Sequence, residues 1–286
     1  MSFVIEDVLV RNDPIGHALP LVLDSPHSGV SYPVEFEFSC PMMAIRQTES
    51  TYLEELYAAA PESGATLLSA LFPRSFIDVN HALDDLEPSM IDRAWPEPMR
   101  PSEQSSRGAG LIPWLCGPGI PMYDGSLSVH QVAERIDRYY RPYHAQLLLA
   151  LNRAHLRFGV VWHISCHAMP APGAIGSEDP PSVDFVLGDH AGTSCDRRFT
   201  NYVRMSLQSM GYQVAVDDRH HGHDLVRRYG QPTRGRHSLR IEVNRNLFMN
   251  AETLEKNDRF DQLQSDISRL IGGLGGYVQA AAAAAE

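Results

Sequence analysis

Three apolar segments, far apart in the sequence, each end at or beside a polar side chain that can do chemistry. Leu21–Asp24 and Val160–Ile164 each precede a histidine, and Ser238–Met249 carries Glu242 inside an apolar run. Short apolar runs of this kind favour buried strands. A carboxylate in such a run needs a cation, a metal or a reacting proton to offset its loss of water. In open α/β sheets, ligands bind beyond the carboxyl ends of the strands, so we expect these polar groups to meet at one edge of a sheet.

Helical periods alternate with strand-like runs along the chain. Pro142 is expected to kink one helix, and Gly272 and Gly273 are expected to end another. Strands that alternate with helices predict a three-layer α/β fold, in which a mostly parallel (mixed) central sheet has helices on both faces. The helical segments are 48–60, 128–158, 196–210 and 251–271, and further strand candidates are 65–72, 75–80, 185–188 and 212–216.

The length of 286 residues is enough for one substantial hydrophobic core. We expect residues 1–275 to form a single domain. Residues 87–121 are rich in Pro, Gly and Ser and show no regular period, which favours a lid or binding loop over a linker. The Ala-rich end, residues 276–286, is interpreted as a low-complexity tail, either a helical extension or frayed.

Charge and composition exclude several classes of function. The net charge of −11 would repel nucleic acid phosphates and anionic membranes, so we expect neither as a partner. The sequence has no apolar run long enough to span a bilayer, and its start does not look like a signal peptide. Four cysteines without a Cys-x-x-Cys pair argue against a disulfide scaffold. We therefore expect a soluble cytoplasmic protein.

His27 and His167 are the strongest candidates for metal ligands, because each stands at the end of a predicted strand. Neutral imidazole is the commonest nitrogen ligand of zinc, and two histidines with one carboxylate are a common catalytic set. Glu49, at the expected start of a helix, is the acidic ligand that we favour. An acidic residue in a first helical turn is ordinarily there for the helix dipole. Nearby competitors are Glu35, Glu37, Glu54 and Glu55.

Other side chains allow rival interpretations. His220, His221 and His223 form a dense cluster that offers a second metal site, although a solvated loop is the simpler interpretation. His163 would share a strand face with His167, which favours a core or supporting role for it. Cys166 would point to the opposite face, so we expect a packed small residue and not a nucleophile.

Arginines lie near the expected strand ends or in the flanking loops. A planar guanidinium group binds a carboxylate through two hydrogen bonds, so a pair of arginines could hold an acidic substrate. The alternative for at least half of them is an ordinary ion pair with Asp or Glu. The candidates are Arg74, Arg227, Arg228, Arg240 and Arg245.

Taken in order, the motifs resemble those of the N-formylglutamate amidohydrolase family. Each motif is short, but the ordered set is specific and spans most of the chain, from about Leu21 to Met249. The matching pieces are Pro26-His27-Ser28-Gly29, Arg74 to Asn80, Cys166-His167-Ala168-Met169-Pro170, Leu187-Gly188-Asp189, Gly192-Thr193-Ser194-Cys195, Arg227-Arg228-Tyr229-Gly230-Gln231-Pro232 and Ile241-Glu242-Val243-Asn244-Arg245.

The resemblance implies a fold similar to that of zinc carboxypeptidases (the phosphorylase/hydrolase-like fold) and of zinc-dependent cell-wall amidases. It implies one zinc ion on His27, Glu49 and His167, with Glu242 as the catalytic glutamate. It further implies hydrolysis of N-formyl-L-glutamate, a small anionic N-acyl amino acid, to formate and L-glutamate in histidine degradation. The candidates for binding the substrate carboxylates or the oxyanion are Arg74, Asn80, Arg227 and Arg245.

Two alternatives stay open at this point. A related zinc amidase or deacylase could act on another N-acyl amino acid or on a peptide. A binding protein could keep the fold and the pocket without hydrolysis, but Glu242 argues against this class, because a ligand carrier has no need of a general base.

Overall fold

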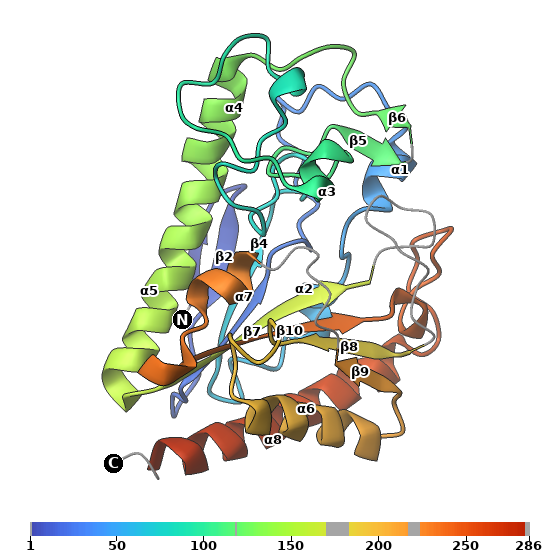
Figure 1. The fold of residues 1–286 in the computed structure, drawn as a ribbon. Coiled ribbons are helices and arrows are strands. Elements are labelled where there is room, and N and C mark those ends of the chain that lie inside the picture. The colour runs from blue at the N-terminus through green and yellow to red at the C-terminus, as the bar shows by residue number, and fades with distance from the viewer. Residues whose placement is uncertain (1, 118, 170–182, 217–223, 284–286) are drawn as a thin grey trace.

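A computed structural model of the chain describes residues 2–117, 119–169, 183–216 and 224–283 (Figure 1). Its centre is an eight-stranded sheet in the order β1-β2-β4-β3-β7-β10-β8-β9. The strands β4, β3, β7 and β10 are parallel neighbours, whereas β1, β2 and β8 introduce antiparallel pairs. The strands are β1 Ser2–Ile5, β2 Leu9–Asn12, β3 Leu21–Ser25, β4 Thr66–Ala70, β7 Val161–Ala168, β8 Phe185–Gly188, β9 Val214–Val216 and β10 Arg236–Val243.

Helices cover both faces of this sheet. In Figure 1, α6 and α8 lie against one face, and α5 and α7 lie against the other. The predicted three-layer, mostly parallel (mixed) α/β fold is therefore confirmed. The helices are α1 Met42–Arg46, α2 Leu53–Leu56, α3 Glu103–Ser106, α4 Val129–Arg135, α5 Arg141–Phe158, α6 Arg197–Ser209, α7 Asp224–Tyr229 and α8 Phe260–Ala283.

The two faces of β7 differ in chemistry. Trp162, Ile164 and Cys166 point into the core shared with α6 and α8, and the predicted packing of Cys166 is confirmed. The alternate residues His163 and His167 face the α5 side, although they are equally buried. Side chains alternate along a strand, so one face of this strand fills a core while the other presents polar groups.

Residues 75–80 form turns and not the predicted strand. Phe76, Ile77 and Val79 are all buried, which explains the strand-like apolar pattern. The backbone nevertheless turns here, because the carboxylate of Asp78 accepts a hydrogen bond from the backbone N–H of Asn80 (2.9 Å). Asp side chains stabilise such turns by bonding their own backbone two residues on. This correction places Asp78 in a buried loop.

Two helix predictions also need correction. The predicted helix 48–60 contains only the short α2 flanked by turns, and Glu49 lies in the turn before it. The last helix begins at Phe260 and continues through Gly272 and Gly273 to Ala283. Each internal glycine costs about 1 kcal/mol relative to alanine, but Leu274 and Val278 extend the buried stripe beyond the pair. Packing therefore outweighs the local preference.

The long segment 128–158 is helical throughout. Its α4 and α5 parts are joined by a π-helical stretch, Ile136–Tyr140, directly before Pro142. A proline lacks the backbone N–H that an unbroken helix needs, and π-turns are one common way to absorb such a break. The hydrogen-bonding pattern of the helix therefore changes just before Pro142, and the predicted kink itself stays a prediction.

The segment 87–121 lies above the sheet in Figure 1 and carries only short elements. These are a 3₁₀ turn at Pro88–Met90, the helix α3 and the small hairpin of β5 (Leu115–Gly117) and β6 (Ile120–Pro121). Its predicted role as a lid stays a prediction. Among the helices of the described ranges, we find none with the length and apolar character needed to cross a bilayer.

Candidate active site

His27 and His167 meet at the carboxyl edge of the sheet. His27 follows β3 in a tight loop and His167 lies near the end of the parallel neighbour β7. Their Nδ1 atoms are 3.2 Å apart and both side chains are buried. Gly29 makes the loop possible, because a Cβ at this position would collide with the backbone of Leu71 and Phe72. The predicted convergence of the two imidazoles is confirmed.

Each imidazole is fixed through its other ring nitrogen. Nε2 of His27 lies 2.7 Å from Oδ1 of Asp78, and Nε2 of His167 lies 3.0 Å from Oγ of Ser165. Desolvation by burial lowers the pKa of His27 and lowers that of His167 still further. Both rings are therefore neutral near pH 7, the form in which imidazole binds metals.

Asp78 is held between His27 and Arg74. Its second oxygen, Oδ2, accepts a hydrogen bond from Nη2 of Arg74 at 2.7 Å. Burial alone would raise the pKa of this carboxyl, but the neighbouring His27 and Arg74 outweigh it and hold the pKa of Asp78 well below its usual range. Asp78 is therefore ionised, and it is a site residue that the sequence patterns did not single out.

The side chain of Glu49 is fully buried, in a turn that is hydrogen-bonded to both histidine segments. The hydroxyl of Tyr32 donates a hydrogen bond to Oε1, whereas Oε2 has no hydrogen-bond partner among the described residues. Burial raises the pKa of Glu49 to about 7. A buried carboxylate oxygen without a donor is costly, so this atom is suited to bind a cation.

Ser50 connects Glu49 to both histidine segments. Its backbone N–H donates to the carbonyl of His27 (2.9 Å), and its Oγ accepts from the backbone N–H of Ala168 (3.2 Å). These two bonds tie the turn that carries Glu49 to the loop after β3 and to the end of β7. Three remote segments of the chain are thus joined at one point.

Arg245 binds backbone carbonyls. Its Nε, Nη1 and Nη2 donate to the carbonyl oxygens of Met169, Gln47 and Glu49 at 2.8, 2.9 and 3.0 Å. Burial, together with the nearby Arg74, lowers the pKa of Arg245 to about 10. The side chain therefore connects the Glu49 turn to the backbone that follows His167.

Glu242 lies beside His167. The two residues are register partners in the parallel pair β7–β10, so their side chains leave the sheet on the same face. One carboxylate oxygen is 3.2 Å from Nη1 of Arg240, and 19% of the side chain is exposed. A partly exposed carboxylate next to the histidine pair is placed to exchange protons with water. The catalytic role of Glu242 itself stays a prediction.

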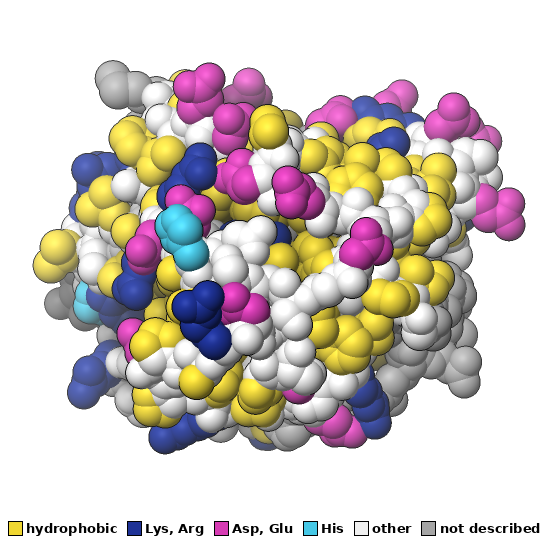
Figure 2. All heavy atoms as spheres, turned by 90° about the horizontal axis from the view of Figure 1, so that it is seen from above, with side chains coloured by type: hydrophobic (Ala, Val, Ile, Leu, Met, Phe, Trp, Pro, Cys, Tyr) yellow, Lys and Arg dark blue, Asp and Glu magenta, His cyan; other side chains and the backbone are white. Residues whose placement is uncertain are grey.

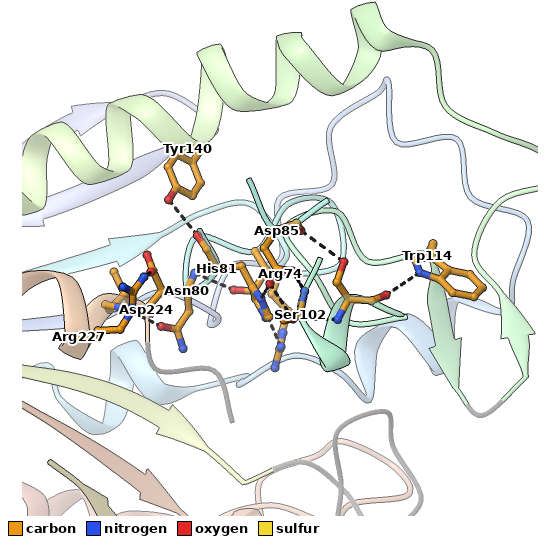
Figure 3. A network of polar contacts seen from close by, with 12 residues as sticks. Arg74, Asn80, His81, Asp85, Ser102, Trp114, Tyr140, Asp224 and Arg227 are labelled. Atoms are coloured by element: carbon orange, nitrogen blue, oxygen red, sulfur yellow. Dashed lines mark hydrogen bonds and ion pairs between the residues drawn. The ribbon is translucent and has the colours of Figure 1, made fainter. Parts of the chain in front are cut away.

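Three of the predicted substrate-binding residues, Arg74, Asn80 and Arg227, belong to the network of polar contacts in Figure 3. The side chain of Arg74 is 28% exposed beyond its contact with Asp78. Asn80 is buried, and its Oδ1 accepts from the backbone N–H of Leu225 (3.1 Å) at the start of α7. Arg227 is 59% exposed and pairs with Asp224 at 2.6 Å. Both arginines therefore combine a fixed position with exposed surface, and Arg74 is the one whose partner, Asp78, contacts His27.

The donor set fits a zinc ion, although no group of three or more His, Cys, Asp or Glu side chains within the described ranges already stands at ligand geometry. In a tetrahedral site with Zn–N bonds of 2.0–2.1 Å, two ligand nitrogens are about 3.3 Å apart. The observed Nδ1–Nδ1 distance of 3.2 Å agrees with this value. Oε2 of Glu49 is a buried carboxylate oxygen without a hydrogen-bond partner among the described residues. A single N–H···N hydrogen bond also suits the distance, so the metal needs its own measurement.

Other sequence predictions fall elsewhere. His220, His221 and His223 lie outside the described residues. Two competitors of Glu49 are engaged in ion pairs: Glu35 with Arg138 at 2.9 Å and Glu55 with Lys256 at 2.5 Å.

Asp78, Ser50 and Arg240 are the residues that sequence reasoning missed or left unassigned at the site. An acidic residue inside an apolar run indicates a buried carboxylate, and this pattern is the reason for choosing Glu242. Asp78 has the same pattern, because it stands between Ile77 and Val79. The sequence therefore contains a signal that identifies Asp78 as well.

Comparison with known proteins decides the family. The profile described as N-formylglutamate amidohydrolase matches residues 19–249, most of the chain. This chain belongs to the N-formylglutamate amidohydrolase family. The predicted resemblance is thereby confirmed, and the matched range contains His27, Glu49, His167 and Glu242.

Individual relatives agree with this assignment. The chain is 25% identical to an N-formylglutamate deformylase of Pseudomonas putida over 238 residues, which is 81% of this chain and 82% of the relative. A deformylase of the same name from Pseudomonas aeruginosa is also 25% identical, over 240 residues. A crystal structure of N-formylglutamate amidohydrolase from Ralstonia eutropha JMP134 is 40% identical, with a TM-score of 0.91 and coverage of 96% of this chain and 99% of that chain.

Proposed function

We propose that this protein hydrolyses N-formyl-L-glutamate to formate and L-glutamate with the help of one zinc ion. The observation that carries the proposal is the pair of neutral imidazoles 3.2 Å apart at the sheet edge, with Glu242 on the neighbouring strand. The family membership and the 40% identity to an N-formylglutamate amidohydrolase support the choice of substrate. The ligands would be His27, Glu49 and His167. When bound, zinc supplies Lewis-acid polarisation of a carbonyl and makes water acidic enough to attack near neutral pH.

Glu242 performs the proton transfers in this proposal. Its carboxylate accepts a proton from the attacking water as the C–O bond forms at the formyl carbon. It then delivers that proton to the amine nitrogen as the C–N bond breaks, which releases formate and L-glutamate. General acid–base catalysis of this kind contributes about 10²- to 10⁴-fold. Nη1 of Arg240 lies 3.2 Å from one carboxylate oxygen of Glu242 and thereby helps to fix the position of the group that must accept the proton.

The substrate carries two carboxylates, and the protein must bind them although its own negative net charge repels anions. The net charge is −11, and on the face seen from above in Figure 2 acidic and apolar side chains are interspersed among the described residues. Such a field repels anions, so a local cation is needed. Arg74 is our first candidate, with Asn80 and Arg227 as further ones, whereas we assign Arg245 to holding the Glu49 turn.

By the family resemblance, the reaction would be a late step of histidine degradation in the cytoplasm. The proposal is tested by measuring the free amino acid and the carboxylic acid (formate, acetate or succinate) that protein loaded with one equivalent of zinc releases. The substrates should be the N-formyl, N-acetyl and N-succinyl derivatives of L-glutamate and L-aspartate. N-formyl-L-glutamate should have the highest kcat/KM. A clear preference for an acetyl or succinyl compound would reassign the protein to another N-acyl amino acid, and binding of all six without acid release would indicate a non-catalytic relative.

A further inference from the structure

We propose that Asp78 is a positioning residue of this site, which fixes the tautomer and the orientation of His27 so that Nδ1 faces the point shared with His167. The inference rests on the proposed metal-dependent function, and it adds a residue that neither the sequence motifs nor the family comparison assigned. Asp78 acts through His27 and is not expected to touch the substrate.

The proton on His27 can be located from the chemistry of its partner. Both oxygens of Asp78 already accept hydrogen bonds, Oδ1 from the backbone N–H of Asn80 and Oδ2 from Nη2 of Arg74, as a carboxylate that can only accept does. The 2.7 Å contact between Oδ1 of Asp78 and Nε2 of His27 therefore requires the proton on Nε2. The Nδ1 lone pair of the neutral ring is then directed at Nδ1 of His167, 3.2 Å away. This lone pair therefore points towards the position that a cation between the two rings would occupy.

The carboxylate of Asp78 is itself held at both oxygens. Oδ1 also accepts from the backbone N–H of Asn80 (2.9 Å), and Oδ2 accepts from Nη2 of Arg74 (2.7 Å). The backbone N–H of Asp78 donates to the carbonyl of Leu111 (2.8 Å), which fixes the turn from the side of the 87–121 segment. Because these partners fix the carboxylate in place, the hydrogen bond to Asp78 sets the orientation of the His27 ring.

Carboxylates that hydrogen-bond a metal-binding histidine orient the ring and increase its basicity, and their loss typically weakens metal binding about 10- to 100-fold. Arg74 adds a second consequence in this chain. Because Arg74 binds Asp78 and keeps further N–H donors at a 28% exposed surface, a substrate carboxylate bound there would be connected to His27 through one intervening residue. Metal ligand and substrate carboxylate thus share Asp78 as a common support.

The chain offers a matched control in a second buried pair. Nε2 of His163 lies 3.0 Å from Oδ1 of Asp24, and Oδ2 of Asp24 accepts from the hydroxyl of Tyr143 at 2.7 Å. Both pairs are almost fully buried. Nδ1 of His163, however, is bound to Oγ of Ser238 at 2.7 Å, so this ring has no nitrogen left for a metal.

The experiment measures zinc affinity of the metal-free, folded protein by competition with a chromophoric chelator. Asp78→Asn should weaken zinc binding about 10- to 100-fold, and Asp24→Asn should change it less than about threefold, both judged against thermal unfolding curves that show a folded protein. Unchanged zinc affinity in Asp78→Asn, or equal weakening in both variants, would overturn the proposal. Because the readout is metal binding, a wrong substrate assignment would not imitate either outcome.

A measurement on the wild-type chain keeps the proposal testable if Asp78→Asn does not fold. Long-range ¹H–¹⁵N NMR of metal-free protein distinguishes the two neutral tautomers of a histidine, and His27→Gln identifies the signals of His27. We expect the proton of His27 on Nε2. A proton on Nδ1 would contradict the proposed role of Asp78, whatever the protein hydrolyses.

Discussion

Two buried histidine–aspartate pairs lie on the same side of the central sheet, and they differ in how many hydrogen bonds they leave open. In the pair of His163 and Asp24, both ring nitrogens have partners inside the protein, Ser238 and Asp24. In the pair of His27 and Asp78, the partner of the second ring nitrogen among the described residues is the nitrogen of another imidazole. Buried polar atoms normally find a partner. The first pair is therefore complete as folded, whereas the second pair leaves room for a group that the described part of the chain does not supply.

The position of each pair along its strand explains the difference. His163 lies inside β7, where neighbouring strands and α5 surround it, and Tyr143 of α5 reaches Asp24. His27 lies in the loop after β3, at the carboxyl edge where strand pairing has ended. At that edge the loops of several strands can bring side chains together that have no structural partner. One type of residue pair thus stabilises the sheet interior and prepares a site at its edge.

The largest expected effect tests whether the edge is catalytic and not merely a ligand site. Glu242→Gln should lower kcat for formate release by about 10²- to 10⁴-fold, because the amide cannot accept the proton of water. Zinc content should stay that of the wild type, since Glu242 is not among the proposed ligands. Steady-state kinetics and metal analysis on the same sample provide the check. Turnover within about threefold of wild type would remove Glu242 from the mechanism.

The comparison of the two pairs is tested directly by replacing each histidine with glutamine. His27→Gln should weaken zinc binding by more than the roughly hundredfold that loss of a supporting partner can cost. His163→Gln should leave zinc affinity nearly unchanged and instead reduce stability by about 1–3 kcal/mol, because buried partners lose a hydrogen bond. Zinc titration and urea unfolding of both variants separate the effects. Equal loss of zinc binding in both would end the distinction between an open and a complete pair.

A third buried histidine extends the comparison, because it has no carboxylate partner. His144 binds the carbonyl of Val79 at 2.9 Å and the hydroxyl of Tyr229 at 2.7 Å, and burial lowers its pKa to about 3, with Arg228 acting in the same direction.

Since the folded state binds this proton more weakly than the unfolded state does, His144 contributes stability above pH 6.5 that is lost as the pH falls towards 3. Between pH 7 and pH 5 the loss should be about 2 kcal/mol. Urea unfolding at the two pH values should show this loss in wild type and a smaller one in His144→Gln. Identical pH dependence in the two proteins would contradict it.

The smallest expected effect concerns substrate binding beside the open pair. Arg74→Gln should lower kcat/KM for N-formyl-L-glutamate at least about tenfold, because a charge-assisted hydrogen bond is worth about 1.5–3 kcal/mol. Arg227→Gln is the control, since its side chain is 59% exposed and already paired with Asp224. Kinetics with both variants, at matched zinc content, test this order. A greater loss in Arg227→Gln would move the carboxylate site to α7.

Much of the fold could be predicted from apolar runs, because strands and helices of this chain bury regular patterns. The meeting of His27 and His167 followed from their positions after parallel strands. The turn at 75–80 could not be predicted in the same way, since Phe76, Ile77 and Val79 are buried in a loop and mimic a strand. The helix through Gly272 and Gly273 depends on tertiary packing that no local signal reports.

The candidate site was predictable to the extent that it uses strand ends. Glu49 was chosen for the start of a helix, but it lies in the turn before α2, where Ser50 and Arg245 hold it in place. These hydrogen bonds join segments of the chain that are 118 and 196 residues apart in the sequence. Spacing in the sequence carries no information about them.

The most direct test of the central claim is the zinc stoichiometry of freshly purified protein, measured together with formate release before and after chelation. We expect about one zinc per chain, loss of formate release on chelation, recovery on adding one equivalent of zinc, and no bound zinc in the His27→Gln, His167→Gln double variant. Full formate release from metal-free wild type, or one zinc per chain retained in the double variant, would contradict the proposal that these two imidazoles hold the catalytic ion.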